Sequence, residues 1–260
     1  MSSKPIGIFD SGVGGLSICK EIRQLLPLES TLYLSDSKNA PYGPKGPKAI
    51  LDLSIKNTEY LIDHGSKLIV VACNTATTNA VEYLRDNYSV PFIGIEPAIK
   101  PAALQSKTKA IGILATKGTL SSSLFHKTSQ LYSNDLIVVE QVGNGIVELI
   151  EQGGLHSKEM RSLLNTYLSP MIRARIDFLV LGCTHYHFLT PMLKELLPNN
   201  VSIIDSAEAV ARQTKSILEL NKLSNIGLIK GESQFYTNGE HTIIEGLLKS
   251  ENVRLEKLDF

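Results

Sequence analysis

Two cysteines occupy similar positions in the chain, and both positions suit a reactive thiol. Cys73 follows the apolar run 68–72, Cys183 follows the run 178–182, and polar residues come directly after each cysteine. If a helix starts there, its free amides stabilise a thiolate, so that the thiol can act as a base or a nucleophile. A single cysteine of this kind is more often a buried core residue. The repeated context therefore favours chemistry at both thiols.

The third cysteine, Cys19, lies among apolar residues of a predicted helix, and we expect it in the core. Three cysteines that are far apart, with no C-x-x-C pair, argue against a disulfide framework and a four-thiolate zinc site. A thiol–disulfide enzyme is disfavoured because no resolving cysteine is close in sequence to either candidate thiol. A reducing cytoplasm is the expected location.

The segment Asp10-Ser-Gly-Val-Gly-Gly15 follows an apolar run and leads into a predicted helix, so its amides could hold an anion. As a dinucleotide-binding signature it is incomplete, because Ser17 stands where the third glycine belongs. One interpretation is a tight strand-to-helix turn. The other is a site in which Asp10 takes a substrate ammonium group or holds a proton acceptor.

Cys183, His185 and His187 alternate along the chain, and thiolate and imidazole are both zinc ligands. On an extended segment the three side chains would share one face. We expect a helix from about Thr184, which removes that shared face, and the N-terminal half offers no matching ligand. The prediction is therefore no metal, with His185 supporting the neighbouring thiol.

These residues need a scaffold, and the hydrophobic pattern predicts one. Continuous apolar runs are typical of parallel strands covered by helices on both faces. Strands are expected at 6–9, 32–34, 68–72, 92–94, 111–114, 136–139, 178–181 and 201–204, and helices at 16–26, 48–64, 77–86, 157–175 and 207–220. Asp205 or Ser206 could cap the last helix. The pattern predicts a doubly wound α/β fold, in which ligands bind beyond the carboxyl ends of the strands.

An internal repeat relates the two parts of the chain. Segment 68–75 resembles 178–185, and segment 6–12 resembles 111–117, in the same order and about a hundred residues apart. We therefore expect two pseudo-symmetric doubly wound halves with the active site in the cleft between them. The Pro/Gly-dense stretch 41–47 is expected to be an ordered loop near the strand ends.

Composition excludes several classes of protein. The 260 residues are 43% hydrophobic and 20% charged, which is ordinary for a globular protein and unlike a disordered or membrane chain. Twenty-six basic residues balance 26 acidic ones, so nucleic acid and membrane partners are not expected and a small-molecule ligand is. The N-terminus lacks a secretory signal pattern.

Four motifs in this sequence resemble those of the cofactor-independent glutamate racemases. They occur in that family's order, and the similarity extends over nearly the whole chain. They are Ile8-Phe-Asp-Ser-Gly-Val-Gly-Gly-Leu16, Asp36 with Ala40-Pro-Tyr-Gly43, Ala72-Cys-Asn-Thr-Ala-Thr77 and Leu181-Gly-Cys-Thr-His185, with no departure at a motif position. The resemblance implies no cofactor, a homodimer, and two domains, 1–97 completed by 208–260, and 98–207. It also implies a role in supplying D-glutamate for peptidoglycan.

The resemblance further implies roles for individual residues. Cys73 and Cys183 would be the acid/base pair on opposite faces of the substrate α-carbon, and Asp10, Glu151 and His185 would assist them. The glutamate pocket would be lined by Asp10, Ser11, Pro41, Tyr42, Gly43, Asn74, Thr75, Thr116, Thr119, Thr184 and His185. Two alternatives stay open. They are a racemase of another acidic amino acid such as aspartate, which would keep both thiols, and a non-catalytic two-lobed amino-acid-binding protein, which would need neither.

Overall fold

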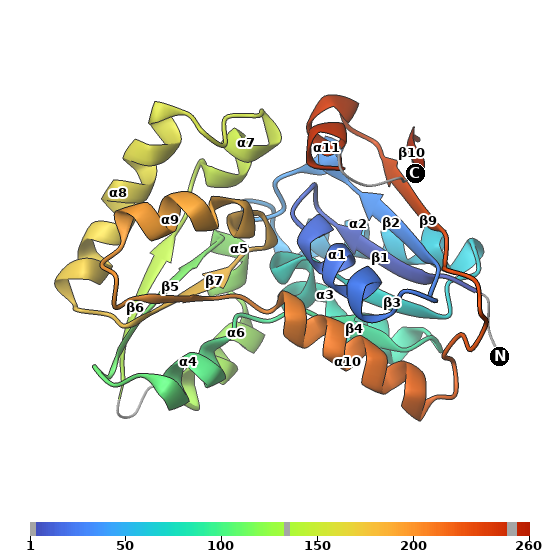
Figure 1. Ribbon diagram of the computed structural model, residues 1–260, viewed down its shortest axis with the longest axis horizontal. Coiled ribbons are helices and arrows are strands. Elements are labelled where there is room, and N and C mark those ends of the chain that lie inside the picture. The colour runs from blue at the N-terminus through green and yellow to red at the C-terminus, as the bar shows by residue number, and fades with distance from the viewer. Residues whose placement is uncertain (1–3, 133–135, 249–253) are drawn as a thin grey trace.

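The described part of the chain forms two parallel sheets that lie side by side (Figure 1). The computed structural model describes residues 4–132, 136–248 and 254–260. The first sheet has the order β10-β9-β2-β1-β3-β4, and the second has the order β6-β5-β7-β8. All strand pairs within both sheets are parallel. The predicted α/β class with parallel sheets is confirmed.

The first sheet is built from both ends of the chain. Its strands are β1 (Ile6–Asp10), β2 (Thr31–Ser35), β3 (Leu68–Val71), β4 (Phe92–Gly94), β9 (Ser233–Thr237) and β10 (Arg254–Lys257). The second sheet comes from the middle of the chain and contains β5 (Ala110–Ala115), β6 (Ile137–Val142), β7 (Phe178–Gly182) and β8 (Ser202–Ile204). All eight predicted strands are present, whereas β9 and β10 were not predicted. The proposed domain boundaries, after residues 97 and 207, stay a prediction.

The helices cover both faces of each sheet, as Figure 1 shows for α8 and α9 on one side of the second sheet and α4 and α6 on the other. The helices are α1 (Leu16–Leu25), α2 (Pro47–Asp63), α3 (Asn74–Asn87), α4 (Ile99–Gln105), α5 (Lys117–Leu120), α6 (Ser123–Gln130), α7 (Ile146–Glu151), α8 (Lys158–Arg173), α9 (Thr190–Leu196), α10 (Ala207–Leu220) and α11 (His241–Leu248). Two short 3₁₀ helices, η1 (Ser37–Asn39) and η2 (Thr184–Leu189), follow β2 and β7. Among the residues that the structure describes, no helix is long and apolar enough to cross a membrane.

The internal repeat has a counterpart in the topology. Strands β1 and β3 are neighbours in the first sheet, with Ile6 opposite Leu68, and β5 and β7 are neighbours in the second, with Ile111 opposite Phe178. A buried apolar cluster continues from the first sheet into the second and includes residues of β1, β3, β5 and β7. The two repeated strand pairs therefore lie in equivalent central positions and share a core.

The structure makes two local expectations more specific and corrects a third. The segment after Cys183 is a 3₁₀ helix over Thr184–Leu189, because its chain turns directly into Thr190 and Pro191, where α9 begins with proline in its first turn. Helix α3 starts at Asn74, immediately after Cys73, rather than at 77. At α10 only Asp205 caps, since its Oδ1 accepts from Ala207 N at 3.0 Å, while Ser206 Oγ donates to Glu96 O at 2.5 Å.

Candidate active site

Cys73 lies at the carboxyl end of β3 and is the N-cap residue of α3. Its Sγ accepts a hydrogen bond from Ala76 N at 3.5 Å and donates to Ser11 Oγ at 3.6 Å. Burial raises the pKa of this thiol well above its ordinary value, and the neighbouring Asp10 raises it further, whereas the Ala76 amide and Ser11 lower it. The helix amide therefore acts in the predicted direction, but burial outweighs it and keeps the thiol protonated at neutral pH.

Asp10 ends β1, the strand beside β3, so the register of the sheet places it near Cys73. The carboxylate is fully buried and accepts hydrogen bonds from Ser11 N at 2.7 Å and Gly15 N at 2.5 Å. Thr184, from the other sheet, donates its hydroxyl to Asp10 Oδ2 at 3.2 Å. Burial raises the pKa of Asp10, while the charge of His185 and the two amides oppose that rise. Asp10 thus joins the carboxyl ends of the two sheets.

Cys183 lies at the carboxyl end of β7 and contacts a histidine–glutamate pair. Its Sγ is 3.9 Å from His185 Nδ1, and His185 Nε2 is 2.5 Å from Glu151 Oε1. Burial alone lowers the pKa of His185, but its contacts with Cys183 and Glu151 raise that pKa well above 6.5. Burial opposes ionisation of Glu151, yet its hydrogen bonds to His185, Val13 and Ser37 lower its pKa below 4.5. The imidazolium–carboxylate form of this pair is therefore favoured at neutral pH.

The glycine-rich turn packs directly on this histidine–glutamate pair. A Cβ at Gly12 would lie 1.9 Å from Glu151 Oε1, and a Cβ at Gly14 would lie 2.5 Å from His185 Nδ1. Val13 N, between them, donates to Glu151 Oε1 at 2.8 Å. The glycines are thus required for the close approach of the backbone to two side chains. This observation supports the interpretation of the motif as a tight strand-to-helix turn and gives the structural reason for its glycines.

Three threonines connect the two halves on the other side of the site. Thr75 Oγ1, at the start of α3, is 2.8 Å from Thr116 Oγ1 and 3.4 Å from Thr119 Oγ1, and both partners belong to the start of α5. Asn74 is also buried, and its Oδ1 has no hydrogen-bond partner among the described residues. An unpaired buried amide oxygen is costly, so it marks a place where a ligand donor would be stabilising.

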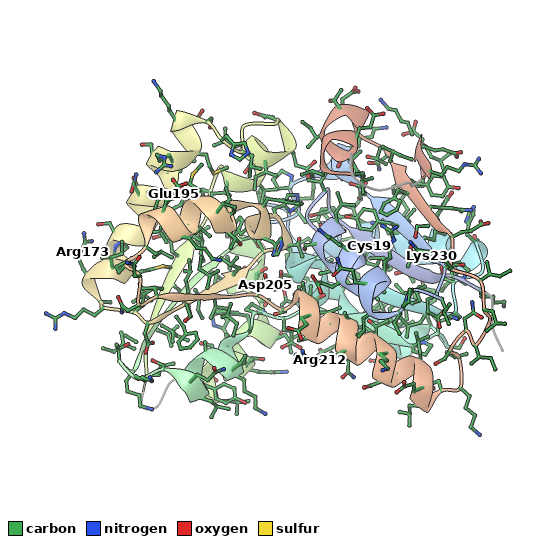
Figure 2. All side chains as sticks on the ribbon, in the orientation of Figure 1. Cys19, Arg173, Glu195, Asp205, Arg212 and Lys230 are labelled. Carbon is green, nitrogen blue, oxygen red and sulfur yellow. The ribbon has the colours of Figure 1, made fainter. Side chains whose placement is uncertain are left out.

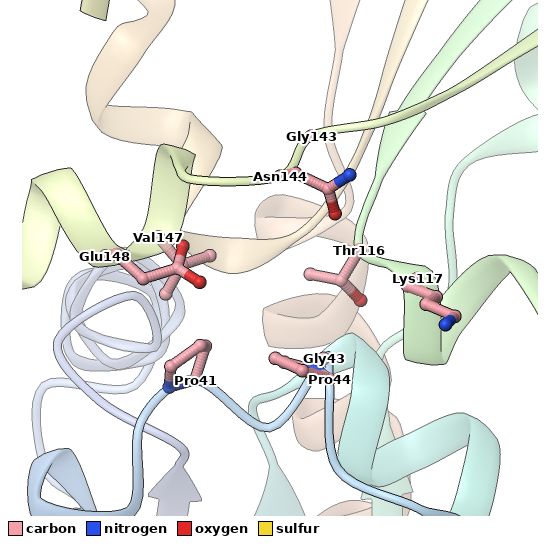
Figure 3. Close-up of a pocket in the computed structure, with 9 residues that line it drawn as sticks. All are labelled: Pro41, Gly43, Pro44, Thr116, Lys117, Gly143, Asn144, Val147 and Glu148. Atoms are coloured by element: carbon pink, nitrogen blue, oxygen red, sulfur yellow. The ribbon is translucent and has the colours of Figure 1, made fainter.

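Figure 3 shows a pocket between the two halves that has Pro41, Gly43 and Pro44 on one wall and residues of the second half on the other. The facing wall consists of Thr116, Lys117, Gly143, Asn144, Val147 and Glu148. Gly43 packs closely on Thr116, which leaves 3.0 Å from a Cβ at Gly43 to Thr116 Cβ. Tyr42, between Pro41 and Gly43, is not among the residues that line this pocket, and its hydroxyl donates to the buried Asp36.

Cys19 and His187, two other residues considered in the sequence, lie outside this constellation. Cys19 is buried in α1 (Figure 2), and burial raises its pKa to about 12, which confirms the expected core position. His187 pairs with Asp205 at 2.8 Å, whereas His185 faces Glu151. Within the described residues, no group of three or more His, Cys, Asp or Glu side chains is arranged to hold a metal ion.

The structure brings the sequence-predicted residues of both halves to one region, and it adds others. Ser37 and Asn238 were not predicted, and Asp36, Gly12 and Gly14 were seen only as motif residues. Ser37 Oγ donates to Glu151 Oε2 at 3.0 Å, and Asn238 contacts Asp36. The motifs gave a signal for the glycines and Asp36. Asn238 comes from a strand end that the hydrophobic pattern did not reveal, so no sequence signal was available for it.

Two parallel sheets whose carboxyl ends meet at a pair of buried thiols define a two-lobed α/β protein with a site between related halves. Comparison with known families gives the class a name. A family model described as Asp/Glu/Hydantoin racemase matches residues 6–214, and this chain belongs to that family.

Individual relatives agree with this assignment. The chain is 44% identical over 240 residues to glutamate racemase from Herpetosiphon aurantiacus. The aligned region covers 92% of this chain and 94% of that protein. Among solved structures, it resembles glutamate racemase from Escherichia coli in complex with L-glutamate and the activator UDP-MurNAc-ala, with a TM-score of 0.85, 33% identity and 98% of each chain covered. It also resembles the Francisella tularensis enzyme in complex with D-glutamate, with a TM-score of 0.86, 28% identity, and coverage of 100% and 98%.

Proposed function

We propose that this chain is a glutamate racemase that interconverts L- and D-glutamate by proton transfer between two thiols, without a cofactor. The observation that carries the proposal is the placement of Cys73 and Cys183 at equivalent strand ends of two related halves, joined through Asp10 and Thr184. The relatives support glutamate as the substrate, since two similar solved structures hold L- and D-glutamate.

Racemisation by proton transfer needs a base on one face of the α-carbon and an acid on the other. In one direction, one cysteine acts as a thiolate and takes the α-proton, and the electron pair of the C–H bond stays on the α-carbon. The other cysteine, as thiol, then delivers its proton to the opposite face and becomes the thiolate. The reverse reaction exchanges the two roles. Positioned acid–base groups of this kind contribute about 10²–10⁴-fold to the rate.

Formation of the thiolate is the step that the surroundings must assist, because both thiols are buried. Asp10 is proposed to assist Cys73 through Ser11, which contacts both groups. His185, held as an imidazolium by Glu151, is proposed to stabilise the Cys183 thiolate by its charge and its Nδ1–H. The two thiols would thus be activated by different means.

Substrate binding is proposed to use the polar groups between the halves. The unpaired Asn74 Oδ1 can accept from the substrate ammonium group. The hydroxyls of Ser11, Thr75, Thr116, Thr119 and Thr184 and the backbone of Pro41, Tyr42 and Gly43 are proposed to bind the rest of the substrate, and Pro41, Gly43 and Thr116 among them line the pocket. Hydrogen bonds from these groups to the α-carboxylate would stabilise the negative charge that develops when the α-carbon is deprotonated.

The wider role follows from the family rather than from the site. We propose that the enzyme works in the cytoplasm as a homodimer and supplies D-glutamate for peptidoglycan. The oligomeric state can be measured by light scattering on the purified protein.

The activity is tested by adding L-glutamate to the purified protein with a chelator and no cofactor, and following the loss of circular dichroism. The expected result is decay to zero ellipticity, from L- and from D-glutamate alike. Decay with aspartate instead of glutamate would identify a different acidic substrate. Tight binding of glutamate with no decay would contradict the enzyme assignment and favour a binding protein.

A further inference from the structure

A buried polar cluster outside the thiol region holds the loop that forms one wall of the pocket. Asp36, at the end of β2, is 1% exposed and accepts hydrogen bonds from Tyr42 OH, from Asn39 Nδ2 at 2.8 Å and from Asn238 Nδ2 at 2.5 Å. Asn57 Nδ2 donates to the Tyr42 hydroxyl at 3.1 Å. Three side chains, from Asn39 and Tyr42 within the 36–43 segment and from Asn238 outside it, are therefore tied to one carboxylate.

Asn238 is the member of this cluster that comes from far along the sequence. It follows β9, the strand that pairs with β2, so the register Ser35 opposite Thr237 brings it beside Asp36. Its Oδ1 accepts from Lys38 N at 2.9 Å while its Nδ2 donates to Asp36. Only this amide orientation suits both partners. In a flipped amide the NH₂ group would face the Lys38 N–H, and the carbonyl oxygen would face the Asp36 carboxylate. The side chain is therefore specifically matched to the turn at Lys38.

The held loop also contacts the catalytic region. Tyr42 packs in the same buried cluster as Cys73, and Gly43 packs against Thr116 of the second half. Displacement of the 36–43 segment would therefore disturb the surroundings of one thiol and the pocket wall together. Gly239 reinforces the tie, since a Cβ there would lie 2.5 Å from Ser37 Cβ.

We propose that Asn238 is a positioning residue for the substrate-binding loop, and that the C-terminal segment thereby completes the active site through Asp36 and Tyr42. The expected change in KM rests on the proposed racemase function, whereas the expected effect on the position of the loop does not. Without the Asn238 amide the loop would populate its binding-competent form less often. The apparent affinity for substrate would fall in proportion to the population of that form.

Two substitutions at this position and one elsewhere make the test specific. Asn238→Ala removes both hydrogen bonds. Asn238→Asp keeps the acceptor for Lys38 N but places a second carboxylate against Asp36, and two adjacent buried carboxylates cannot both ionise. The pair can then share one proton, whose O–H···O⁻ bond replaces the lost amide bond. The matched control is Asn225→Ala, because Asn225 ties the same C-terminal segment to Leu28 O at 2.7 Å, before the amino end of β2 and away from the pocket.

The expected result for Asn238→Ala is a rise in KM for glutamate of about tenfold, with kcat changed much less. For Asn238→Asp, KM should rise with increasing pH toward the Asn238→Ala value, because the shared proton is lost as pH increases. Asn225→Ala should lower the melting temperature and leave KM unchanged.

Hydrogen–deuterium exchange of peptides covering 36–45 gives a readout that does not need activity. Exchange of these amides should accelerate in Asn238→Ala and stay at the wild-type rate in Asn225→Ala. The inference is overturned if Asn238→Ala lowers the melting temperature with KM and loop exchange unchanged. If the wild-type chain racemises nothing, the proposed function fails, and the exchange experiment still decides the role of Asn238.

Discussion

The two thiols lie at equivalent strand ends, yet their surroundings differ. Cys73 caps a regular α-helix and contacts a hydroxyl that is backed by the buried Asp10. Cys183 precedes a 3₁₀ helix, makes no cap bond of that kind among the described residues, and contacts a histidine backed by Glu151. One half therefore supplies a carboxylate and the other a cation. A repeated backbone can thus position two equal groups while the side chains around them give each its own means of activation.

The largest effect is expected from removing either thiol. Cys73→Ser and Cys183→Ser should each reduce racemisation by about 10²–10⁴-fold, because a serine hydroxyl is a far weaker acid–base group at the same place. Circular dichroism with L- and D-glutamate measures the rate. Racemisation at the wild-type rate in either variant would contradict the two-thiol account.

The next effect concerns the support of the Cys183 side. Gly12→Ala would place a methyl group 1.9 Å from Glu151 Oε1, so the histidine–glutamate pair must move, and a shift of about 1 Å near a reacting group can cost about 100-fold in kcat. Gly46→Ala is the matched control, since a Cβ there meets nothing within 4 Å among the described residues and φ is −70°. Equal activity of the two variants would contradict the role of the turn.

A substitution of similar size, Glu151→Gln, tests the charge of the His185–Glu151 pair. Glu151→Gln should lower the His185 pKa and reduce kcat by about tenfold, because a charge-assisted hydrogen bond is replaced by a neutral one. Asp205→Asn, which breaks the more exposed pair with His187, should leave kcat unchanged. NMR titration of the imidazole signals measures both histidines, and an unchanged His185 pKa in Glu151→Gln would contradict the assignment.

The same pair predicts a pH window for stability. The raised His185 pKa contributes stability that is complete below 6.5 and is lost as pH rises through the folded value. The lowered Glu151 pKa contributes stability above 4.5 that is lost as pH falls through its folded value. The difference in unfolding free energy between wild type and Glu151→Gln should therefore be largest between the two ordinary values, 4.5 and 6.5, where both contributions are complete, and should shrink on either side. Denaturant unfolding at several pH values checks this, and a difference independent of pH would refute it.

The smallest effect is expected at the third cysteine. Cys19→Ala should cost about 1 kcal/mol of stability, as for a typical buried substitution, and leave kcat unchanged. Activity assays beside denaturant unfolding test both parts. A large loss of activity would mean that a thiol outside the proposed pair takes part.

The sequence was sufficient for the central strands and the thiols, because continuous apolar runs and repeated motifs are strong local signals. Strand β9 was missed because its sequence, Ser-Gln-Phe-Tyr-Thr, has no continuous apolar run and is only partly buried, and β10, Arg-Leu-Glu-Lys, was missed for the same reason. The start of a helix at Thr184 was predicted correctly, but its 3₁₀ type was not predicted, since a choice between α and 3₁₀ depends on the connection to α9. The partners of Asp36 and Glu151 could not be predicted because they come from strand ends that only the folded sheets bring together.

The most direct test of the central claim is α-proton exchange by the single-thiol variants in D₂O. Each variant keeps one acid–base group, so it should exchange the α-proton of one enantiomer of glutamate and not racemise. Proton NMR of L- and D-glutamate with Cys73→Ser and with Cys183→Ser gives four rates. If one thiol lies on each face of the α-carbon, the two variants should exchange opposite enantiomers. Exchange of the same enantiomer by both would contradict the placement of one thiol on each face of the α-carbon.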